Sequence, residues 1–389
     1  MFKETLKSIV DSIILTEAFF IRPEKKPGDE KKKVLILRKD GLGDCIVFYP
    51  TLKAYREYYK GADITLVFPK YFESLAPIVG KDLVNKVIWF DHKAFSGDFW
   101  YRRKFLLDLS RKGYDVAIYP VFSRESIGDK MIWMTCAKER IGFDGDPSVQ
   151  GKEAKAKGNA TYTRLIDPPP QMRLEIERDR YFAEQVTGMR CDIEFPTFDT
   201  KKLPCAKADS ILSGCGVAGK RFAVIFPGAG APYRIWPAER WAKAIDHISA
   251  KGIAPLICGS DKDARLAQKI SSLATSKAFD ITGKTDLADL AHILTKASFY
   301  FGSDTGILHL AVAVKTPAAA IVGSGGLWRF FPYGDPETNL AIYDKSRPYG
   351  SGVWTDAKEL KPGQIHPSIA AIAVKEAECA IDRLIGVIG

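Results

Sequence analysis

The chain has 389 residues, of which 46% are apolar and 27% are charged, and its formal net charge is +10. This length predicts two or three domains of ordinary size, and the composition excludes a disordered or fibrous protein. The basic excess favours anionic ligands without choosing among nucleic acid, acidic lipid and phosphorylated substrates. Neither zinc-finger spacing nor an RNA-binding signature occurs, so nucleic acid is not an expected partner.

The first 32 residues carry apolar side chains at near-helical spacing, followed by the basic run Lys31-Lys32-Lys33. We expect a helix packed on its own domain. The alternative is an amphipathic helix that lies on the inner membrane as a peripheral contact. The chain has no apolar run of eighteen residues and no secretory signal, so we expect a cytoplasmic protein, either free or on the cytoplasmic face of that membrane.

The seven cysteines are odd in number and form no CxxC pair, which favours free thiols in a reducing compartment. A metal site made from Cys191, Cys205 and Cys215 is an alternative, but their spacing matches no usual ligand pattern. Buried structural thiols are the favoured interpretation, and no metal is expected.

Strand and helix patterns alternate through the first half of the chain. The expected strands are 34–37, 64–68, 87–90 and 115–119, and the expected helices are 46–59, 105–111 and 174–186. The polar stretch 151–170, which ends in three prolines, is predicted to be an irregular loop. The segment 196–219 is rich in Pro, Gly, Ser and Lys and is predicted to hold the domain boundary, with one short helical piece.

The alternation then restarts. The expected strands are 222–226, 254–258, 298–302 and 318–322, and the expected helices are 236–250, 264–274, 286–296, 306–314 and 369–384. Alternating strands and helices predict an α/β fold with two Rossmann-like domains, whose parallel sheets face a central cleft. The predicted limits are 1–32 for the N-terminal amphipathic segment, 33–215 for the first domain, 216–368 for the second, and 369–389 for a C-terminal helix that crosses back to the first domain.

The loop after the first strand reads Asp40-Gly41-Leu42-Gly43-Asp44. Its glycines resemble half of a dinucleotide fingerprint, but Ile46 stands where the third glycine belongs, which argues against a nicotinamide dehydrogenase. Asp44 is either the N-cap of the following helix or a carboxylate that serves as a general base.

Three loops of the second half also follow strands. Gly228 and Ala229 belong to the glycine-rich loop Pro227 to Gly230, which lets a ligand approach the backbone closely, and Arg234 lies shortly after it. Asp261 ends the next strand, in position to bind ribose hydroxyls. Ser303-Asp304-Thr305-Gly306 precedes a helix whose N-terminus suits a diphosphate. Together these loops predict a nucleotide-diphosphate site.

In these loops and their flanking segments, the chain resembles glycosyltransferase family 9, the heptosyltransferases of bacterial lipopolysaccharide. The resemblance runs from about Val34 to Leu384. It rests on Leu35 to Asp44, on Tyr114-Asp115-Val116, on Arg140-Ile141-Gly142-Phe143, on Pro227-Gly228-Ala229 with Arg234 to Trp241, and on Gly302 to Ala311, which includes Ser303, Asp304, Thr305, Gly306, Ile307, Leu308 and His309.

The resemblance implies a GT-B fold and an inverting, metal-independent transfer of a sugar, with heptose from ADP-heptose as the expected donor and a lipopolysaccharide-core or related glycan as the acceptor. No cofactor is implied beyond the nucleotide sugar itself. By position, Asp44 matches the catalytic base. The donor-binding positions are Gly228, Ala229, Arg234, Asp261, Ser303, Asp304, Thr305, Gly306 and His309. Arg234 departs from the lysine that members often carry there.

Gly43 and Arg124 are expected at the acceptor, Arg124 because it follows a predicted strand and could meet a phosphorylated oligosaccharide. A solvated surface arginine is the alternative for Arg124. Two other functions stay open for the whole chain. One is a GT-B sugar-nucleotide epimerase, and the other is a non-catalytic protein that keeps only the nucleotide-sugar pocket.

Overall fold

The computed structural model describes residues 17, 31–192, 195–346, 360–361 and 363–388. The chain divides into two compact units. Unit 1 comprises Met1–Asp40, Thr51–Met172 and Ile176–Ile193, and unit 2 comprises Gly41–Pro50, Arg173–Glu175 and Glu194–Gly389. The expected N-terminal helix falls outside the described residues. Within the described part of the chain, no helix has the length and apolar character needed to cross a membrane.

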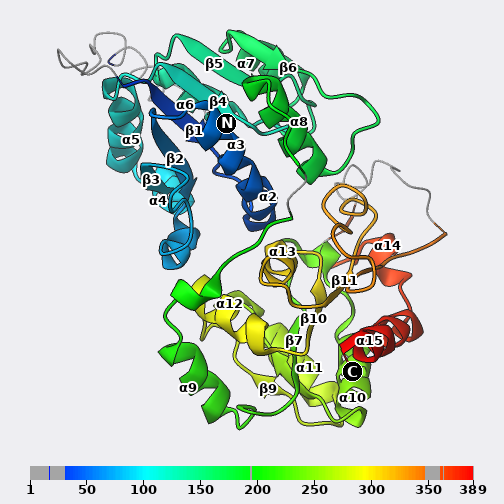
Figure 1. Ribbon diagram of the computed structural model, residues 1–389. Coiled ribbons are helices and arrows are strands. Elements are labelled where there is room, and N and C mark those ends of the chain that lie inside the picture. The colour runs from blue at the N-terminus through cyan, green and yellow to red at the C-terminus, as the bar shows by residue number, and fades with distance from the viewer. Residues whose placement is uncertain (1–16, 18–30, 193–194, 347–359, 362, 389) are drawn as a thin grey trace. The chain divides into compact units, whose positions relative to one another are not determined.

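Unit 1 is built on six parallel strands in the order β3-β2-β1-β4-β5-β6 (Figure 1). Their bounds are Lys33–Leu37 (β1), Asp63–Pro69 (β2), Lys86–Phe90 (β3), Val116–Tyr119 (β4), Glu139–Phe143 (β5) and Arg164–Ile166 (β6). Strand β1 is central and buried, as its continuous apolar run predicts. The strand order reverses between β1 and β4, so ligands are expected at the carboxyl ends of these two strands.

The helices of unit 1 alternate with its strands. They are α3 (Leu52–Tyr58), α4 (His92–Gly97), α5 (Phe99–Arg111), α6 (Ser126–Met134), α7 (Lys152–Asn159) and α8 (Glu175–Thr187), whose first residue is counted in unit 2. Helix α5 begins six residues before the predicted start because the Asp98 carboxylate accepts the backbone N–H groups of Trp100 and Tyr101. One apolar cluster joins β1, β4, α5 and α6.

Unit 2 is built on a second sheet of six parallel strands, in the order β12-β11-β10-β7-β8-β9. Their bounds are Phe222–Phe226 (β7), Ala254–Ile257 (β8), Phe279–Asp280 (β9), Phe299–Ser303 (β10), Ala318–Ile321 (β11) and Asn339–Ile342 (β12). Here the order reverses between β7 and β10. The carboxyl ends of these two strands therefore form the switch point of unit 2.

The helices of unit 2 are α2 (Leu42–Phe48), α9 (Ala206–Gly214), α10 (Ala238–Ala250), α11 (Ala264–Leu273), α12 (Leu287–Lys296), α13 (Gly306–Ala313), α14 (Pro367–Ala370) and α15 (Val374–Ile388). Trp236 and Trp241 are fully buried and pack edge-to-face at 5.3 Å between ring centroids. The Trp236 indole N–H donates to the carbonyl of Ile372 at 3.0 Å, which fixes the chain between α14 and α15. This tryptophan motif therefore builds the core.

The α/β fold with two parallel sheets is confirmed, but three local predictions are wrong. The expected helix 46–59 is two helices, α2 and α3, separated by a 3-10 turn at Tyr49–Thr51 that contains Pro50. The expected loop 151–170 contains α7 and β6. Helix α7 buries no residue and β6 is an edge strand, so neither leaves an apolar pattern.

The expected final helix 369–384 is interrupted between α14 and α15. Helix α15 buries Ala377, Ile381 and Leu384 in the same core as Trp236 and Trp241. Helix α15 contacts α10, β11 and β12, which all belong to unit 2, and a return of the chain to the first domain stays a prediction. The apolar face of α15 is therefore buried in the core of unit 2.

Candidate functional site

A hydrogen bond joins the two strands at the switch point of unit 2. The Ser303 hydroxyl, at the end of β10, donates to the carbonyl oxygen of Pro227 just after β7, at 3.0 Å. The Tyr300 hydroxyl donates to the carbonyl of Ser303 at 3.0 Å from within the sheet. Ser303 is buried, so its contribution is to hold the two loops together.

Asp304 and Arg234 form the charged pair of this site. One guanidinium nitrogen of Arg234 donates to the backbone carbonyl of Asp304 at 2.6 Å and lies 3.5 Å from its carboxylate. Burial raises the pKa of Asp304, and the positive charge of Arg234 opposes that rise. The arginine is the more exposed partner, with 28% of its side chain accessible, so it can contact an anion as well.

The Asp304 carboxylate lies against Gly326, in the loop after β11. A Cβ atom at position 326 would collide with its Oδ2 atom. Glycine is therefore required for the loop to approach the carboxylate. Gly326 gives no motif of its own in the sequence, which is why sequence reasoning missed it.

Helix α13 starts at the same switch point. Thr305 is its N-cap in extended conformation, with no side-chain capping bond, and Gly306 is its first residue. The backbone N–H groups at the start of a helix have no intrahelical partner, and the helix dipole adds partial positive charge there. The start of α13 therefore offers partners for an anion beside Arg234, and its role in binding a diphosphate stays a prediction.

His309 is buried one turn further along α13. Its Nδ1 atom lies 2.9 Å from the Tyr333 hydroxyl, and the two rings stack at 5.6 Å between centroids. Burial lowers the pKa of His309 to about 4, so the imidazole is neutral at neutral pH. Tyr333 is a further residue that sequence reasoning missed, because nothing near it in sequence marks it as polar and buried.

Helix α2 packs directly on α13. A Cβ atom at Gly43 would lie 2.5 Å from Cδ2 and 3.0 Å from Nε2 of His309, and one at Gly306 would collide with Leu42. Glycines on both helices thus allow close backbone approach. Gly43, expected at the acceptor, therefore contacts the donor-motif helix, and α2 is counted in unit 2 for this reason.

Asp44 is half-buried in the first turn of α2. The N-cap of this helix is Gly41, so the alternative that Asp44 is the N-cap is wrong. The carboxylate folds back over the backbone of Gly41, where an added Cβ would lie 2.7 Å from Oδ2. Asp44 follows Gly43 on α2. The packing of α2 on α13 therefore sets the position of Asp44 relative to His309.

Replacing Gly43 with alanine is expected to destabilise the protein by about 1–3 kcal/mol, because the methyl group overpacks a His309 ring that Tyr333 holds in place. Alanine is otherwise the better helix former by about 0.5–1 kcal/mol. Denaturant unfolding of Gly43→Ala and of Gly214→Ala, each compared with the unmodified chain, measures the effect. Gly214 ends α9 with open space around it, so equal stabilities of the two variants would contradict the close packing.

Burial of a neutral His309 predicts a pH dependence of stability. The ordinary pKa is 6.5 and the folded value is about 4, so the unfolded chain binds more protons between these two pH values. The stability is therefore complete above pH 6.5 and decreases as the pH falls toward 4, by about 3 kcal/mol. Unfolding experiments across this range should show a smaller decrease for His309→Gln, and an unchanged slope would contradict the prediction.

The loops after β7 and β8 meet at Asp263. A Cβ at Gly228 would collide with the Asp263 carboxylate, and one at Gly259 would lie 2.8 Å from the Asp263 Cβ. The Asp263 carboxylate also accepts the N–H and hydroxyl of Ser260, which completes a capping box. The spacing Ser-x-x-Asp is the signal that could have identified Asp263.

Asp261 lies exposed at the end of β8, with its carboxylate against Gly283. Ala229 is half-buried in the loop after β7. These two predicted donor positions therefore follow adjacent strands, and Asp263 lies between their loops. The ribose role of Asp261 stays a prediction.

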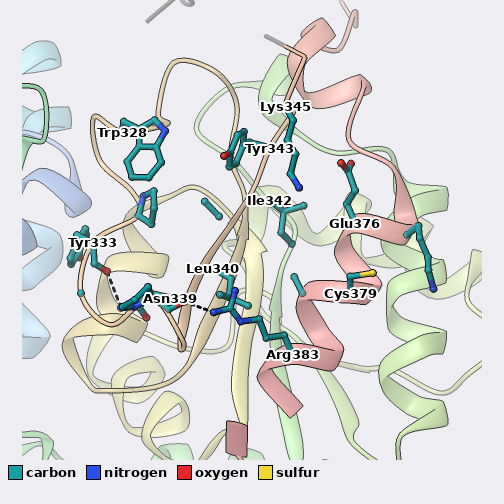
Figure 2. Close-up of a pocket in the computed structure, with 16 residues that line it drawn as sticks. Trp328, Tyr333, Asn339, Leu340, Ile342, Tyr343, Lys345, Glu376, Cys379 and Arg383 are labelled. Atoms are coloured by element: carbon teal, nitrogen blue, oxygen red, sulfur yellow. Dashed lines mark hydrogen bonds between the residues drawn. The ribbon is translucent and has the colours of Figure 1, made fainter. Parts of the chain in front are cut away.

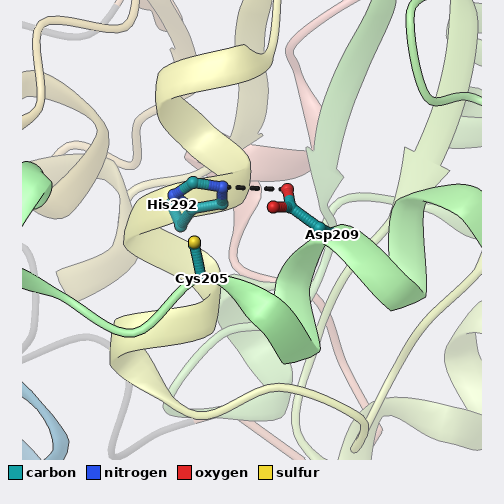
Figure 3. Close-up of side chains that lie close together, drawn as sticks. All are labelled: Cys205, Asp209 and His292. Carbon is teal, nitrogen blue, oxygen red and sulfur yellow. Dashed lines mark hydrogen bonds and ion pairs between the residues drawn. The ribbon is translucent and has the colours of Figure 1, made fainter.

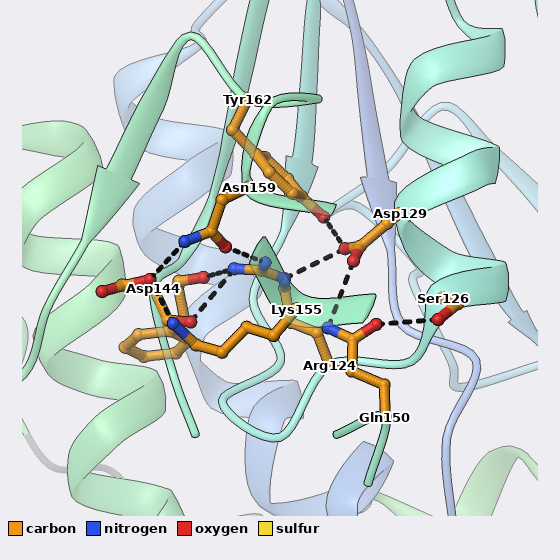
Figure 4. A network of polar contacts seen from close by, with 9 residues as sticks. Arg124, Ser126, Asp129, Asp144, Gln150, Lys155, Asn159 and Tyr162 are labelled. Atoms are coloured by element: carbon orange, nitrogen blue, oxygen red, sulfur yellow. Dashed lines mark hydrogen bonds and ion pairs between the residues drawn. The ribbon is translucent and has the colours of Figure 1, made fainter. Parts of the chain in front are cut away.

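Arg124 is not a surface arginine, because it is 1% exposed. Its guanidinium lies inside the polar network drawn in Figure 4, and an acceptor role stays a prediction. Its Nε atom donates to Asp129 at 3.0 Å, Nη1 donates to the carbonyl oxygens of Phe143 and Asp144, and the guanidinium stacks 4.7 Å from the centre of the Tyr162 ring. Tyr162 also donates to Asp129 at 2.6 Å. The side chain is used to hold unit 1 together.

A second polar cluster lies at the switch point of unit 1. Lys39 is buried and pairs with Glu125 at 2.6 Å, and its backbone carbonyl contacts the His92 ring. The Tyr71 hydroxyl donates to the carbonyl of Asp40 at 2.6 Å. The pKa of His92 is lowered mainly by burial and further by the positive charge of Lys39. Sequence reasoning missed these residues because they are far apart along the chain.

Unit 2 also has a cavity of about 670 Å³ beside its edge strand β12 (Figure 2). Tyr333, Leu340 and Ile342 form part of its wall, and Lys345 and Arg383 contribute cations. The Asn339 amide donates to the carbonyl of Tyr333 at 2.9 Å, which ties the strand to the loop that supports His309.

Two parallel α/β sheets of this order, with polar loops at the switch points, define the GT-B class of two-domain fold. The chain belongs to glycosyltransferase family 9 (heptosyltransferase), whose family model matches residues 102–348. It is thus a member of a family of glycosyltransferases.

Among curated proteins, lipooligosaccharide heptosyltransferase 2 of Haemophilus influenzae is 28% identical over 123 residues, which cover 30% of this chain and 36% of that protein. Lipopolysaccharide heptosyltransferase 3 of Escherichia coli is 28% identical over 116 residues, which cover 29% and 34%. The alignments thus span about a third of the length of each relative.

Among solved structures, the glycosyl transferase family 9 protein from Veillonella parvula has a TM-score of 0.74 at 17% identity and covers 94% of this chain and 100% of that one. The Escherichia coli ADP-heptose lps heptosyltransferase II has a TM-score of 0.65 at 17% identity, with 92% and 100% covered. At such identities the likeness shows the fold alone.

Proposed function

We propose that the protein is an inverting, metal-independent glycosyltransferase that moves heptose from ADP-heptose to a lipopolysaccharide-core or related glycan, with Asp44 as the general base. The observation that carries the proposal is the packing of Gly43 on His309, which fixes the Asp44 helix to the donor-motif helix. Membership of family 9 and the names of the aligned heptosyltransferases support the choice of sugar.

In this mechanism the donor diphosphate binds at the start of α13. The N–H groups after Thr305 and the guanidinium of Arg234 contact the phosphate oxygens. Negative charge grows on the leaving diphosphate as its bond to the anomeric carbon breaks, and these groups stabilise that charge without further reorganisation. Asp304 orients Arg234 because its backbone carbonyl accepts a 2.6 Å hydrogen bond from the Arg234 guanidinium.

The Asp44 carboxylate takes the proton of the acceptor hydroxyl while the hydroxyl oxygen attacks the anomeric carbon from the face opposite the leaving group. The product is therefore inverted. His309 is buried, neutral and held by its hydrogen bond with Tyr333, so we assign it a role in hydrogen bonding and not in proton donation. The acceptor is expected to be a glycolipid or oligosaccharide, handled at the cytoplasmic face of the inner membrane.

The test is release of ADP from ADP-heptose by the purified protein, with and without a lipopolysaccharide-core acceptor, in the presence of a chelator. Acceptor-dependent release of ADP and a glycan enlarged by one heptose support the proposal. Conversion of the donor without acceptor would instead identify an epimerase. Donor binding without any turnover would identify a non-catalytic binding protein, and no binding of ADP-heptose would exclude this donor.

A further inference from the structure

Helices α9 and α12 of unit 2 are joined by a row of polar contacts. Lys207 pairs with Asp289 at 2.5 Å, the His292 Nε2 atom lies 3.0 Å from the Asp209 carboxylate, and Lys296 lies 2.5 Å from the same carboxylate oxygen. None of these residues is among the predicted donor-binding positions.

Cys205 completes a three-residue cluster at this interface. Figure 3 shows the Cys205 sulfur close to the His292 ring, whose nitrogen is joined to the Asp209 carboxylate. Cys205 is the N-cap of α9, and the Asp209 N–H donates to its carbonyl at 2.9 Å, so the two side chains are one helical turn apart on one face. Their ligand atoms and that of His292 all lie within 4.8 Å of one another.

We propose that Cys205, Asp209 and His292 form a structural zinc site. Thiolate, imidazole and carboxylate are the donor types that zinc binds, and bond lengths of about 2.0–2.3 Å in a tetrahedron place ligand atoms within such mutual distances. The cluster is partly exposed, so water can supply the fourth ligand.

Lys296 is the competitor of the metal ion. Its ammonium group occupies the Asp209 oxygen that also faces His292, and a bound cation would repel it. The Lys296 side chain is 44% accessible, and its long flexible stem allows the ammonium group to turn toward water. Zinc and Lys296 therefore exchange on Asp209, which makes the lysine a test of which carboxylate binds the ion.

The zinc site would join α9, the first α-helix after residue 194, to α12. Helix α9 starts the segment that follows residue 194, and α12 in turn packs on α13, whose first turn carries the donor motif. Zinc here is not part of sugar transfer. Its effect is to fix α9 to α12, which goes beyond the proposed function and does not depend on it.

The test uses the metal-free, full-length protein and cobalt as the spectroscopic probe. We expect one equivalent of Co²⁺ to give visible bands of a tetrahedral site and a near-ultraviolet thiolate-to-cobalt band, both removed by added Zn²⁺. Cys205→Ser and His292→Ala should each lose the one-equivalent signal. Cys379→Ser, a matched change of an exposed cysteine on α15, should keep it. Circular dichroism establishes that every variant is folded before metal is added.

Two more measurements complete the test. Lys296→Ala should bind Zn²⁺ several-fold more tightly than the unmodified chain, and Zn²⁺ should raise the Tm of the unmodified chain but not of Cys205→Ser. The proposal is overturned if the cobalt signal is absent from the unmodified chain or persists in Cys205→Ser. An unchanged affinity in Lys296→Ala would contradict the exchange of zinc and Lys296 on Asp209.

Discussion

Replacing Asp44 with asparagine is expected to lower the turnover number by about 10²–10⁴-fold, which is the usual contribution of a positioned general base. Asparagine keeps the shape of the side chain and its contact over Gly41, but it cannot take the acceptor proton. The donor site lies on other residues, so the affinity for ADP-heptose should stay close to the original value. Steady-state ADP release and calorimetric titration with the donor measure the two quantities.

The matched control is Asp108→Asn, which changes a surface carboxylate paired with Lys104 on α5. It should leave both turnover and donor affinity unchanged. If Asp44→Asn turns over at nearly the original rate, Asp44 is not the base. If it loses donor binding to the same extent as turnover, the residue has a binding role and the mechanism must be revised.

Replacing Arg124 with methionine is expected to destabilise the protein by about 3–5 kcal/mol. The change removes one partner of a buried ion pair and leaves Asp129 charged, while the carbonyl oxygens of Phe143 and Asp144 lose their donor. Denaturant unfolding measures the loss. The comparison is Arg103→Met, a partly exposed arginine paired with Glu17, for which a change of about 1 kcal/mol or less is expected.

The same variant separates the structural role of Arg124 from the acceptor role that its position after a predicted strand suggests. If the arginine is structural, the folded Arg124→Met protein keeps an ordinary KM for the acceptor. A variant of normal stability with a strongly raised acceptor KM would restore the acceptor role.

Elements with continuous apolar runs were predictable from sequence. Strand β1 and the strands β7, β8 and β10 lie where the sequence indicates, because each is buried on both faces of a parallel sheet. Helix α7 and strand β6 were missed for the opposite reason. Both lie at the edge of unit 1, where side chains contact solvent and no period of hydrophobicity results.

The candidate site was predictable where one short segment supplies several residues. Asp304, Thr305, Gly306 and His309 follow one strand and open one helix, so their spacing carries the signal. Tyr333, Gly326 and Asp263 approach the same motifs only through folding. The burial of Arg124 could not be predicted either, since its partners Asp129 and Tyr162 come from different elements of the chain.

The division of the chain also limits how unit 2 could be inherited or isolated. Because unit 2 includes Gly41–Pro50 and Arg173–Glu175 as well as the C-terminal half, the chain passes between the units five times. A fragment that begins at residue 194 would lose α2, and with it both Asp44 and the surface that covers His309. A single recombination event could not transfer the whole unit, so Asp44 and the segment 303–309 are expected to have been inherited together.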